Sequence, residues 1–270
     1  MFSYINREFV NAISGGHKLR IINHAGSVVE NPQQLNEPKP LTSLLWPVPL
    51  PIAIGPDEVT WQWYVFTRYL DLQSVQLIAE EVQKGASHSM FKLLNSTLSV
   101  NSVLVLGEFR KAASPLVRVH SCCITGDVFG SLRCDCQRQL QTSFQKIAAA
   151  GSGAIIYYGS HEGRGIGLYA KAAAYLLQDM GYDTYEANQK LGLPKDSRDF
   201  HEVGAVLKFL RNKGGIRLLT NNPLKTQHLQ EAGIKIDSTE SIVVGVSLHN
   251  QRYIRAKKKA GHLIDNEDLE

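Results

Sequence analysis

The chain has 270 residues, of which 43% are hydrophobic and 20% are charged, and its formal net charge is +4. These values are ordinary for a soluble globular protein and leave room for one or two domains. The mild basicity suits an anionic ligand and is too weak to indicate nucleic-acid binding. The longest apolar stretch, which begins at Leu44, contains three prolines and is too short to span a membrane. We therefore expect neither a nucleic-acid-binding nor a membrane protein.

Residues 1–70 are the part of the sequence that is least informative about function. They hold all three tryptophans and a proline-rich run over 32–56. No secretory signal is predicted, because Arg7 and Glu8 interrupt the start and no apolar segment follows. We expect an N-terminal extension over 1–70. One alternative is that it packs on the rest of the protein through its aromatic residues. The other is that it contacts a partner or covers a substrate. Within it, residues 61–66 are predicted to be a strand or an amphipathic edge.

Helix and strand patterns alternate from residue 75 onward, which favours the α/β class. Apolar spacing predicts helices over 75–84, from 139 to about 150, over 168–180, from 200 to about 210, from 223, and over 253–263. Strands are predicted over 102–109, 116–123, 153–158, 216–220 and 241–248. The polar segment 182–200 is broken by Gly192 and Pro194 and is predicted to be a functional loop.

All four cysteines lie between residues 122 and 136, and Cys123, Cys134 and Cys136 form a C-x10-C-x-C array. Residues two apart in an extended chain point the same way, and the ten-residue loop can bring the first sulfur to the other two. Three thiolates suit a tetrahedral zinc whose fourth position is open to water. The alternative is a cluster of buried free cysteines, and His120 is the nearest candidate for a fourth ligand. In an unsecreted chain such clustering indicates metal ligands rather than disulfides, and hence a reducing cytoplasm.

Starting at Arg118, the pattern R-V-H-S-x-C-x-T-G-D-x-x-x-S-L-R-C-D-C-x-x-Q-L resembles the zinc and phosphate signature of the GTP cyclohydrolase II family. Three later motifs are similar to that family as well: E-G-R-G-I-G-L from Glu162, D-S-R-D-F from Asp196 and T-N-N-P-L-K from Thr220. The resemblance covers roughly residues 100–263. It implies that 71–270 form a catalytic domain with a mixed sheet and packed helices, which opens the guanine ring of GTP for riboflavin synthesis. It also implies one zinc per chain, magnesium on the triphosphate, and a homodimer.

The resemblance implies roles for individual residues. Asp196 would accept a proton, and Arg198 would be the nucleophile at the α-phosphorus. Because a guanidinium stays protonated at neutral pH, the alternative role for Arg198 is to bind the triphosphate through its charge. A third possibility without function is that Arg198 forms only an exposed ion pair. Tyr175 matches the tyrosine of the active-site helix, or is a core tyrosine. Glu162 and Gln139 would bind the guanine, although Glu162 also suits a helix start. The other implied substrate contacts are Arg118, Gly163, Arg164, Thr184, Thr220 and Lys225.

The sequence departs from the family pattern in three places. Cys122 stands where the family has glutamate, Ser160-His161 stands where it has Arg-Gln, and its N-terminal Thr-x-x-Gly-x-Phe hairpin is not recognisable around 86–95. These departures keep two alternatives open, a sibling amidohydrolase on another nucleotide, for example in pyrimidine degradation, and a zinc-stabilised nucleotide-binding protein without turnover.

The C-terminal residues leave one motif without a role. Lys259 and Gly261-His262-Leu263 match the family's C-terminal K-x-G-H-L pattern, to which the sequence assigns no function. The lysine run 257–259 is predicted to be a solvated helix face.

Overall fold

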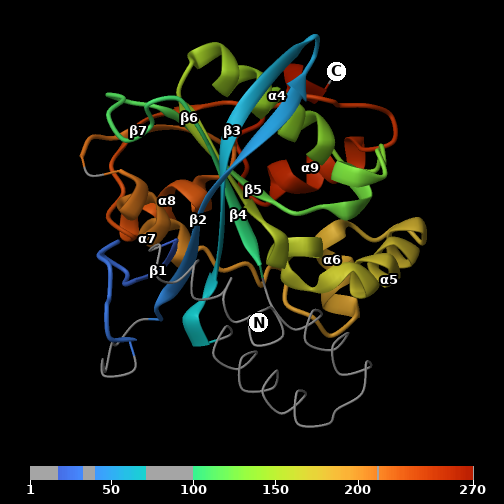
Figure 1. The fold of residues 1–270 in the computed structure, drawn as a ribbon. Coiled ribbons are helices and arrows are strands. Elements are labelled where there is room, and N and C mark those ends of the chain that lie inside the picture. The colour runs from blue at the N-terminus through green and yellow to red at the C-terminus, as the bar shows by residue number, and fades with distance from the viewer. Residues whose placement is uncertain (1–17, 33–39, 71–99, 212, 270) are drawn as a thin grey trace, which may run out of the picture.

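The computed structural model describes residues 18–32, 40–70, 100–211 and 213–269. Its eight strands form one sheet in the order β1-β2-β3-β4-β6-β5-β7-β8, with helices packed against it (Figure 1). The pairs from β1 to β6 are antiparallel, whereas β5 pairs in parallel with both β6 and β7, and β7 with β8. The predicted α/β class with a mixed sheet is confirmed.

The first three strands are β1 (Leu19–Ile22), β2 (Thr42–Ile54) and β3 (Asp57–Arg68). The prediction of a strand over 61–66 is confirmed. The prolines of β2 are tolerated because β1 pairs only with Thr42–Leu45, so the proline-containing half of β2 is an edge whose missing amides face no neighbour strand. A register shift between Leu45 and Val48 accommodates the first of these prolines.

The centre of the sheet consists of β4 (Asn101–Leu106), β5 (Leu116–Ser121) and β6 (Gly153–Tyr158), close to the predicted strands. Their apolar side chains pack into two buried clusters. One includes residues of α7 (His201–Leu210), and the other includes residues of α4 (Cys136–Ala150). Gly151 ends α4 in the left-handed conformation, with φ of 70°, as its sequence position predicts.

Three further helices begin and end within a few residues of their predicted bounds or starts: α5 (Gly167–Asp179), α8 (Pro223–Glu231) and α9 (Gln251–Lys259). The loop prediction for 182–200 is wrong in part, because α6 (Thr184–Lys190) lies inside it. Asp183 accepts hydrogen bonds from the first-turn amides while Glu186 bonds back to the Asp183 amide, and this capping box starts the helix. The predicted helix over 75–84 lies outside the described residues.

The strand predicted over 241–248 is wrong. The ordered strands here are β7 (Ile216–Leu219) and β8 (Ile236–Glu240), and 241–247 have no regular structure. The Ile242 amide donates to the Asn221 side chain, 2.7 Å away, instead of to a neighbouring strand. Ile242 and Val244 are apolar because they pack against the cluster beside α4, which gave the segment its strand-like pattern.

Two features of the fold bear on function. The parallel strands β5, β6 and β7 end at one edge of the sheet, and the segments that follow them carry the sequence motifs; this is where open α/β sheets bind ligands. β1–β3 belong to the same sheet, so the boundary near residue 70 stays a prediction. Among the described residues, every helix is too short or too polar to cross a lipid bilayer.

Candidate metal centre and cationic cavity

Most of the predicted site residues line one cavity, which lies at the carboxyl ends of β5, β6 and β7. The predicted residues that line it are Arg118, Cys123, Cys134, Cys136, Gln139, Gly163, Arg164, Tyr175, Thr184, Arg198, Thr220 and Lys225. Glu162 and Asp196 are not among the lining residues, but each hydrogen-bonds a residue that is, Lys171 and Arg198 respectively.

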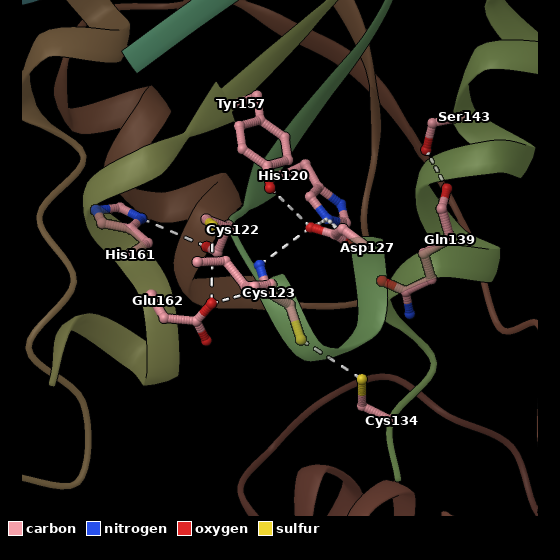
Figure 2. Close-up of polar contacts among 12 residues, drawn as sticks. His120, Cys122, Cys123, Asp127, Cys134, Gln139, Ser143, Tyr157, His161 and Glu162 are labelled. Atoms are coloured by element: carbon pink, nitrogen blue, oxygen red, sulfur yellow. Dashed lines mark hydrogen bonds and ion pairs between the residues drawn. The ribbon is translucent and has the colours of Figure 1, made fainter. Parts of the chain in front are cut away.

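The sulfurs of Cys123, Cys134 and Cys136 converge, and all three lie within 4.8 Å of one another. The Cys123 and Cys134 sulfurs are 3.6 Å apart (Figure 2). Zinc–sulfur bonds of about 2.3 Å at tetrahedral angles place sulfurs about 3.8 Å apart, so the cluster fits one such ion. Cys122 is not part of this cluster; its thiol faces Glu162 at 3.8 Å. The donor set therefore suits a three-sulfur centre with one open position.

A short π-helix, η2 (Ile124–Val128), shapes the loop between the first two cysteines. The Asp127 carboxylate accepts hydrogen bonds from the Cys123 amide and the Tyr157 hydroxyl, both at 3.0 Å, and also contacts His120 (Figure 2). Burial lowers the pKa of this histidine. A Cβ at Gly126 would lie 2.8 Å from the Cys134 sulfur, so the loop requires glycine there. Asp127 thus fixes the backbone that presents the first sulfur.

Lys171, on α5, joins the cysteine loop, residues 123–136, to the E-G-R motif. Its ammonium donates to the Cys123 sulfur at 3.1 Å and to Glu162 at 2.7 Å. Hydrogen bonds from the other two thiols of the cluster, together with this ammonium, lower the pKa of Cys123 and so favour its thiolate. Glu162 also accepts from the Ile124 and Gly163 amides at 2.5 and 2.9 Å, so both of its oxygens are engaged within the protein.

A second buried network lies behind the other two cysteines. Gln139 accepts from Arg118 at 2.6 Å and donates to Asp135 at 2.7 Å. Lys257, on α9, completes it with a 2.6 Å ion pair to Asp135. The prediction that 257–259 form a solvated face is therefore wrong for Lys257, which is 9% exposed. The Asp135 carboxylate, which lies between two of the clustered cysteines, explains why a lysine is buried here.

The E-G-R-G-I-G loop follows β6 as η3 (Gly159–Gly165), part of which is not helical. Arg164 is the one non-glycine residue among those described with a positive φ, 65°. The Tyr185 ring lies 3.9 Å from its guanidinium carbon and the Tyr253 ring 6.0 Å, which holds the strained residue in place.

The D-S-R-D-F motif lies opposite the end of β5. Arg198 makes a bidentate contact with Asp196, with its shortest distance at 2.5 Å, and its Nη1 lies 3.4 Å from the Ser121 hydroxyl. Burial alone would raise the pKa of Asp196, but the hydrogen bonds and charge of Arg198 lower it below its ordinary value. His161 closes this side: its Nε2 lies 2.8 Å from the Asp199 carbonyl and its Nδ1 3.4 Å from Ser121.

The T-N-N-P-L-K motif supplies another part of the cavity wall, and its Lys225 ammonium lies 5.8 Å from the centre of the Phe200 ring in the D-S-R-D-F motif. The Thr220 hydroxyl accepts from the Asn222 amide, and Asn222 caps α8. Lys225 is buried, and its ammonium donates to the Val119 carbonyl at 2.8 Å. Burial, and then the charges of Arg118 and other nearby cations, hold the pKa of Lys225 well below its ordinary value. Such a lysine gains strongly from an anion.

The cavity is strongly cationic. Its charged lining residues are Arg118, Arg133, Arg164, Lys171, Arg198, Lys225 and Lys257, and no aspartate or glutamate of the described chain is among the lining residues. Tyr175 and Thr184 complete the wall near α5 and α6; the Tyr175 hydroxyl lies 3.3 Å from Thr125, and burial raises its pKa. The arrangement suits a multiply charged anion beside a metal ion.

Sequence reasoning missed five residues of this site. They are Asp127, Lys171, Tyr253, Lys257 and His262. The T-G-D and G-H-L patterns pointed to two of them without assigning a role. The other three lie on helix faces, where a cavity-facing lysine or tyrosine has the same spacing as a solvated or core one.

The sequence profile of the GTP cyclohydrolase II family matches residues 78–242. The chain belongs to the GTP cyclohydrolase II family. Among its relatives, the protein named GTP cyclohydrolase-2 of Buchnera aphidicola is 48% identical over 60% of this chain and 82% of its own length. The GTP cyclohydrolase-2 of Psychromonas ingrahamii is 49% identical over 57% and 76%. The riboflavin biosynthesis protein RibBA of Salinispora tropica is 43% identical over 71% and 49%.

This GTP cyclohydrolase II family chain spans about half the length of the RibBA relatives it matches. The matched region contains the three cysteines and all three later motifs. β1–β3 and α9 lie outside it, yet α9 contributes Tyr253 and Lys257 to the cavity.

Proposed function

We propose that the protein opens the imidazole ring of GTP by hydrolysis, in a zinc-dependent reaction that releases formate and diphosphate. The product would be 2,5-diamino-6-ribosylamino-4-pyrimidinone 5′-phosphate, a precursor in riboflavin synthesis. One observation carries the proposal: a three-sulfur cluster opens into a cavity whose charged lining is wholly cationic. The relatives named GTP cyclohydrolase-2 support the choice of GTP.

Cys123, Cys134 and Cys136 would hold the zinc. When bound, the ion supplies a Lewis acid that activates water for attack on the guanine C8. Lys171 favours the thiolate form of Cys123, and Asp127 holds its backbone, so the protein prepares the ligands before the metal arrives.

Arg198 and Lys225 would stabilise the triphosphate, and magnesium, when bound with the nucleotide, would supply further charge compensation. The bidentate contact to Asp196 supports a protonated guanidinium, and hence a charge clamp rather than a nucleophile. Asp196 would then accept a proton only as its contact with Arg198 loosens. Thr220 and Arg164 line the same cavity as Arg198 and Lys225, and they would contact the phosphates or the ribose.

The guanine is assigned to the cavity wall near Gly163 and Thr184, with Glu162 and Gln139 as its predicted partners. Both predicted partners already bond protein groups. Base binding through Glu162 thus requires exchange of the Lys171 or Ile124 contact. Glu162→Gln would raise the KM for GTP if the carboxylate reads the base. It would instead lower metal affinity with an unchanged KM if the carboxylate only holds Lys171.

The test is incubation of the zinc-loaded protein with GTP and magnesium while formate and diphosphate are measured. We expect both products. Formate from another nucleotide but not from GTP would replace the proposal with the sibling amidohydrolase, a reading favoured by His161 and Cys122 in the cavity wall. Nucleotide binding with no product would indicate a binding protein. A homodimer in the cytoplasm stays a prediction, and light scattering tests the dimer.

A further inference from the structure

The C-terminal G-H-L motif is held against the T-N-N-P-L-K motif. The Leu263 amide donates to the Asn221 carbonyl at 2.8 Å, and the Asn221 side chain donates back to the Leu263 carbonyl at 2.8 Å. Gly261 makes this turn possible with a φ of 91° after the end of α9. His262, which lies between Gly261 and Leu263, is thereby placed in the cavity wall.

His262 differs from the other two histidines of the cavity. The rings of His120 and His161 each have polar partners, Asp127 for one and the Asp199 carbonyl for the other. Within the described chain no hydrogen bond is formed by the His262 ring. A half-buried imidazole without a protein partner has its donors and acceptor available to a ligand.

The surroundings of His262 are cationic on every side. Lys257 comes from α9, Arg164 from η3, Lys225 from α8, and Arg198 from the segment before α7. Burial first, and then these four charges, lower the pKa of His262 to about 3. Two of these cations are already ion-paired, Lys257 with Asp135 and Arg198 with Asp196, whereas Arg164 and Lys225 form no ion pair within the described chain. Titratable Tyr253 shares the cavity wall.

We propose that His262 is a substrate-binding residue that contacts the phosphate groups as an imidazolium, taking up one proton from solvent as the anion enters. A triphosphate brings several negative charges among these cations, so attraction to the phosphates replaces the repulsion that, together with burial, keeps the ring neutral. The identification of the anion as a nucleotide triphosphate rests on the proposed function. The contribution to affinity is present at low pH and is lost as pH rises through the pKa of the bound complex.

The test uses inorganic triphosphate as the probe, with the zinc-loaded full chain. Calorimetry in two buffers of different ionisation enthalpy gives the protons taken up, and titrations at pH 6 and pH 8 give the affinity. The probe's own ionisation is the same for every variant and cancels in the comparison. We expect the parent to take up close to one more proton than His262→Gln at pH 6. We also expect its affinity to fall about tenfold more than that of the variant between pH 6 and pH 8.

Two further variants make the result decisive. His262→Arg carries a guanidinium that stays protonated at both pH values, so it should keep tight binding without the extra proton. His249→Gln removes an exposed histidine outside the cavity and should match the parent. Equal proton uptake in the parent and His262→Gln overturns the inference. A parent that takes up the proton through His262 but releases neither formate nor diphosphate from GTP overturns the proposed function alone.

Discussion

Two parts of the cavity differ in how their charges are compensated: the sulfur end around Cys123, Cys134 and Cys136, and the cationic end around Arg198, Lys225 and His262. At the sulfur end, the carboxylates of Asp127, Asp135 and Glu162 are all paired with donors from the protein. At the cationic end, Arg198 pairs with Asp196, but Lys225 has only a backbone carbonyl as its partner and His262 has none among the described residues. The protein therefore organises the sulfur end by itself, whereas the cationic end becomes compensated when an anion binds.

The largest effect should come from breaking the sulfur end. Cys134→Ser removes one of three thiolates, so zinc content should fall from near one per chain toward zero and formate release should stop. Metal analysis and X-ray absorption, which should show three sulfur neighbours in the parent, measure this. Cys122→Ser is the control and should retain the metal, since its thiol lies outside the cluster. A shell of four sulfurs that includes Cys122 would contradict the open site.

Breaking the cationic end should have a different signature. Arg198→Ala removes the guanidinium opposite β5 and should slow diphosphate release by about 100-fold or more, as loss of a charge-stabilising group does. Zinc content should not change. The matched control is Arg255→Ala, an exposed arginine of α9 that does not line the cavity. A diphosphate rate within threefold of the parent would remove Arg198 from the phosphate-binding assignment.

The support of the sulfur end can be weakened without touching a ligand. Asp127→Asn puts an amide where the carboxylate accepts several hydrogen bonds, which should cost about 1–3 kcal/mol of unfolding free energy. It should also weaken zinc binding about 10–100-fold, as loss of an outer-sphere partner does. Denaturant unfolding and competition with a chelator measure the two quantities. Asp179→Asn, at an exposed ion pair with Arg133, should change neither.

The two ends of the cavity also differ in how well the sequence alone predicts them. The sulfur end was largely predictable, because the spacing of Cys123, Cys134 and Cys136 is local and suits a metal directly. The cationic end required the fold, because Arg198, Lys225 and His262 come from three separate segments. Motifs suggested the first two, but only the Asn221–Leu263 contacts show why the third lies beside them. The strand prediction for 241–248 failed because apolar residues that pack beside a sheet have the same pattern as residues within it.

The smallest expected effect concerns a departure from the family pattern. Changing Ser160-His161 to Arg-Gln adds one positive charge next to position 161, which lines the proposed substrate cavity; if the new side chain reaches the phosphates, about 1–3 kcal/mol of binding would lower the KM for GTP roughly tenfold. Ser160→Arg alone separates the charge from the loss of the His161 contact to Asp199. Ser160 lines a second cavity behind His161, so the added side chain has space. Unchanged KM together with poor turnover in every form would indicate a different natural substrate.

The most direct test of the separation between the two ends is a pair of time courses, formate and diphosphate, measured together for the parent, Cys134→Ser and Arg198→Ala with GTP and magnesium. We expect the ratio of formate to diphosphate to fall in Cys134→Ser, which can still release diphosphate slowly, and to rise in Arg198→Ala. If both variants lose the two products in the same constant ratio, a single shared step controls both hydrolyses and the two ends do not act separately.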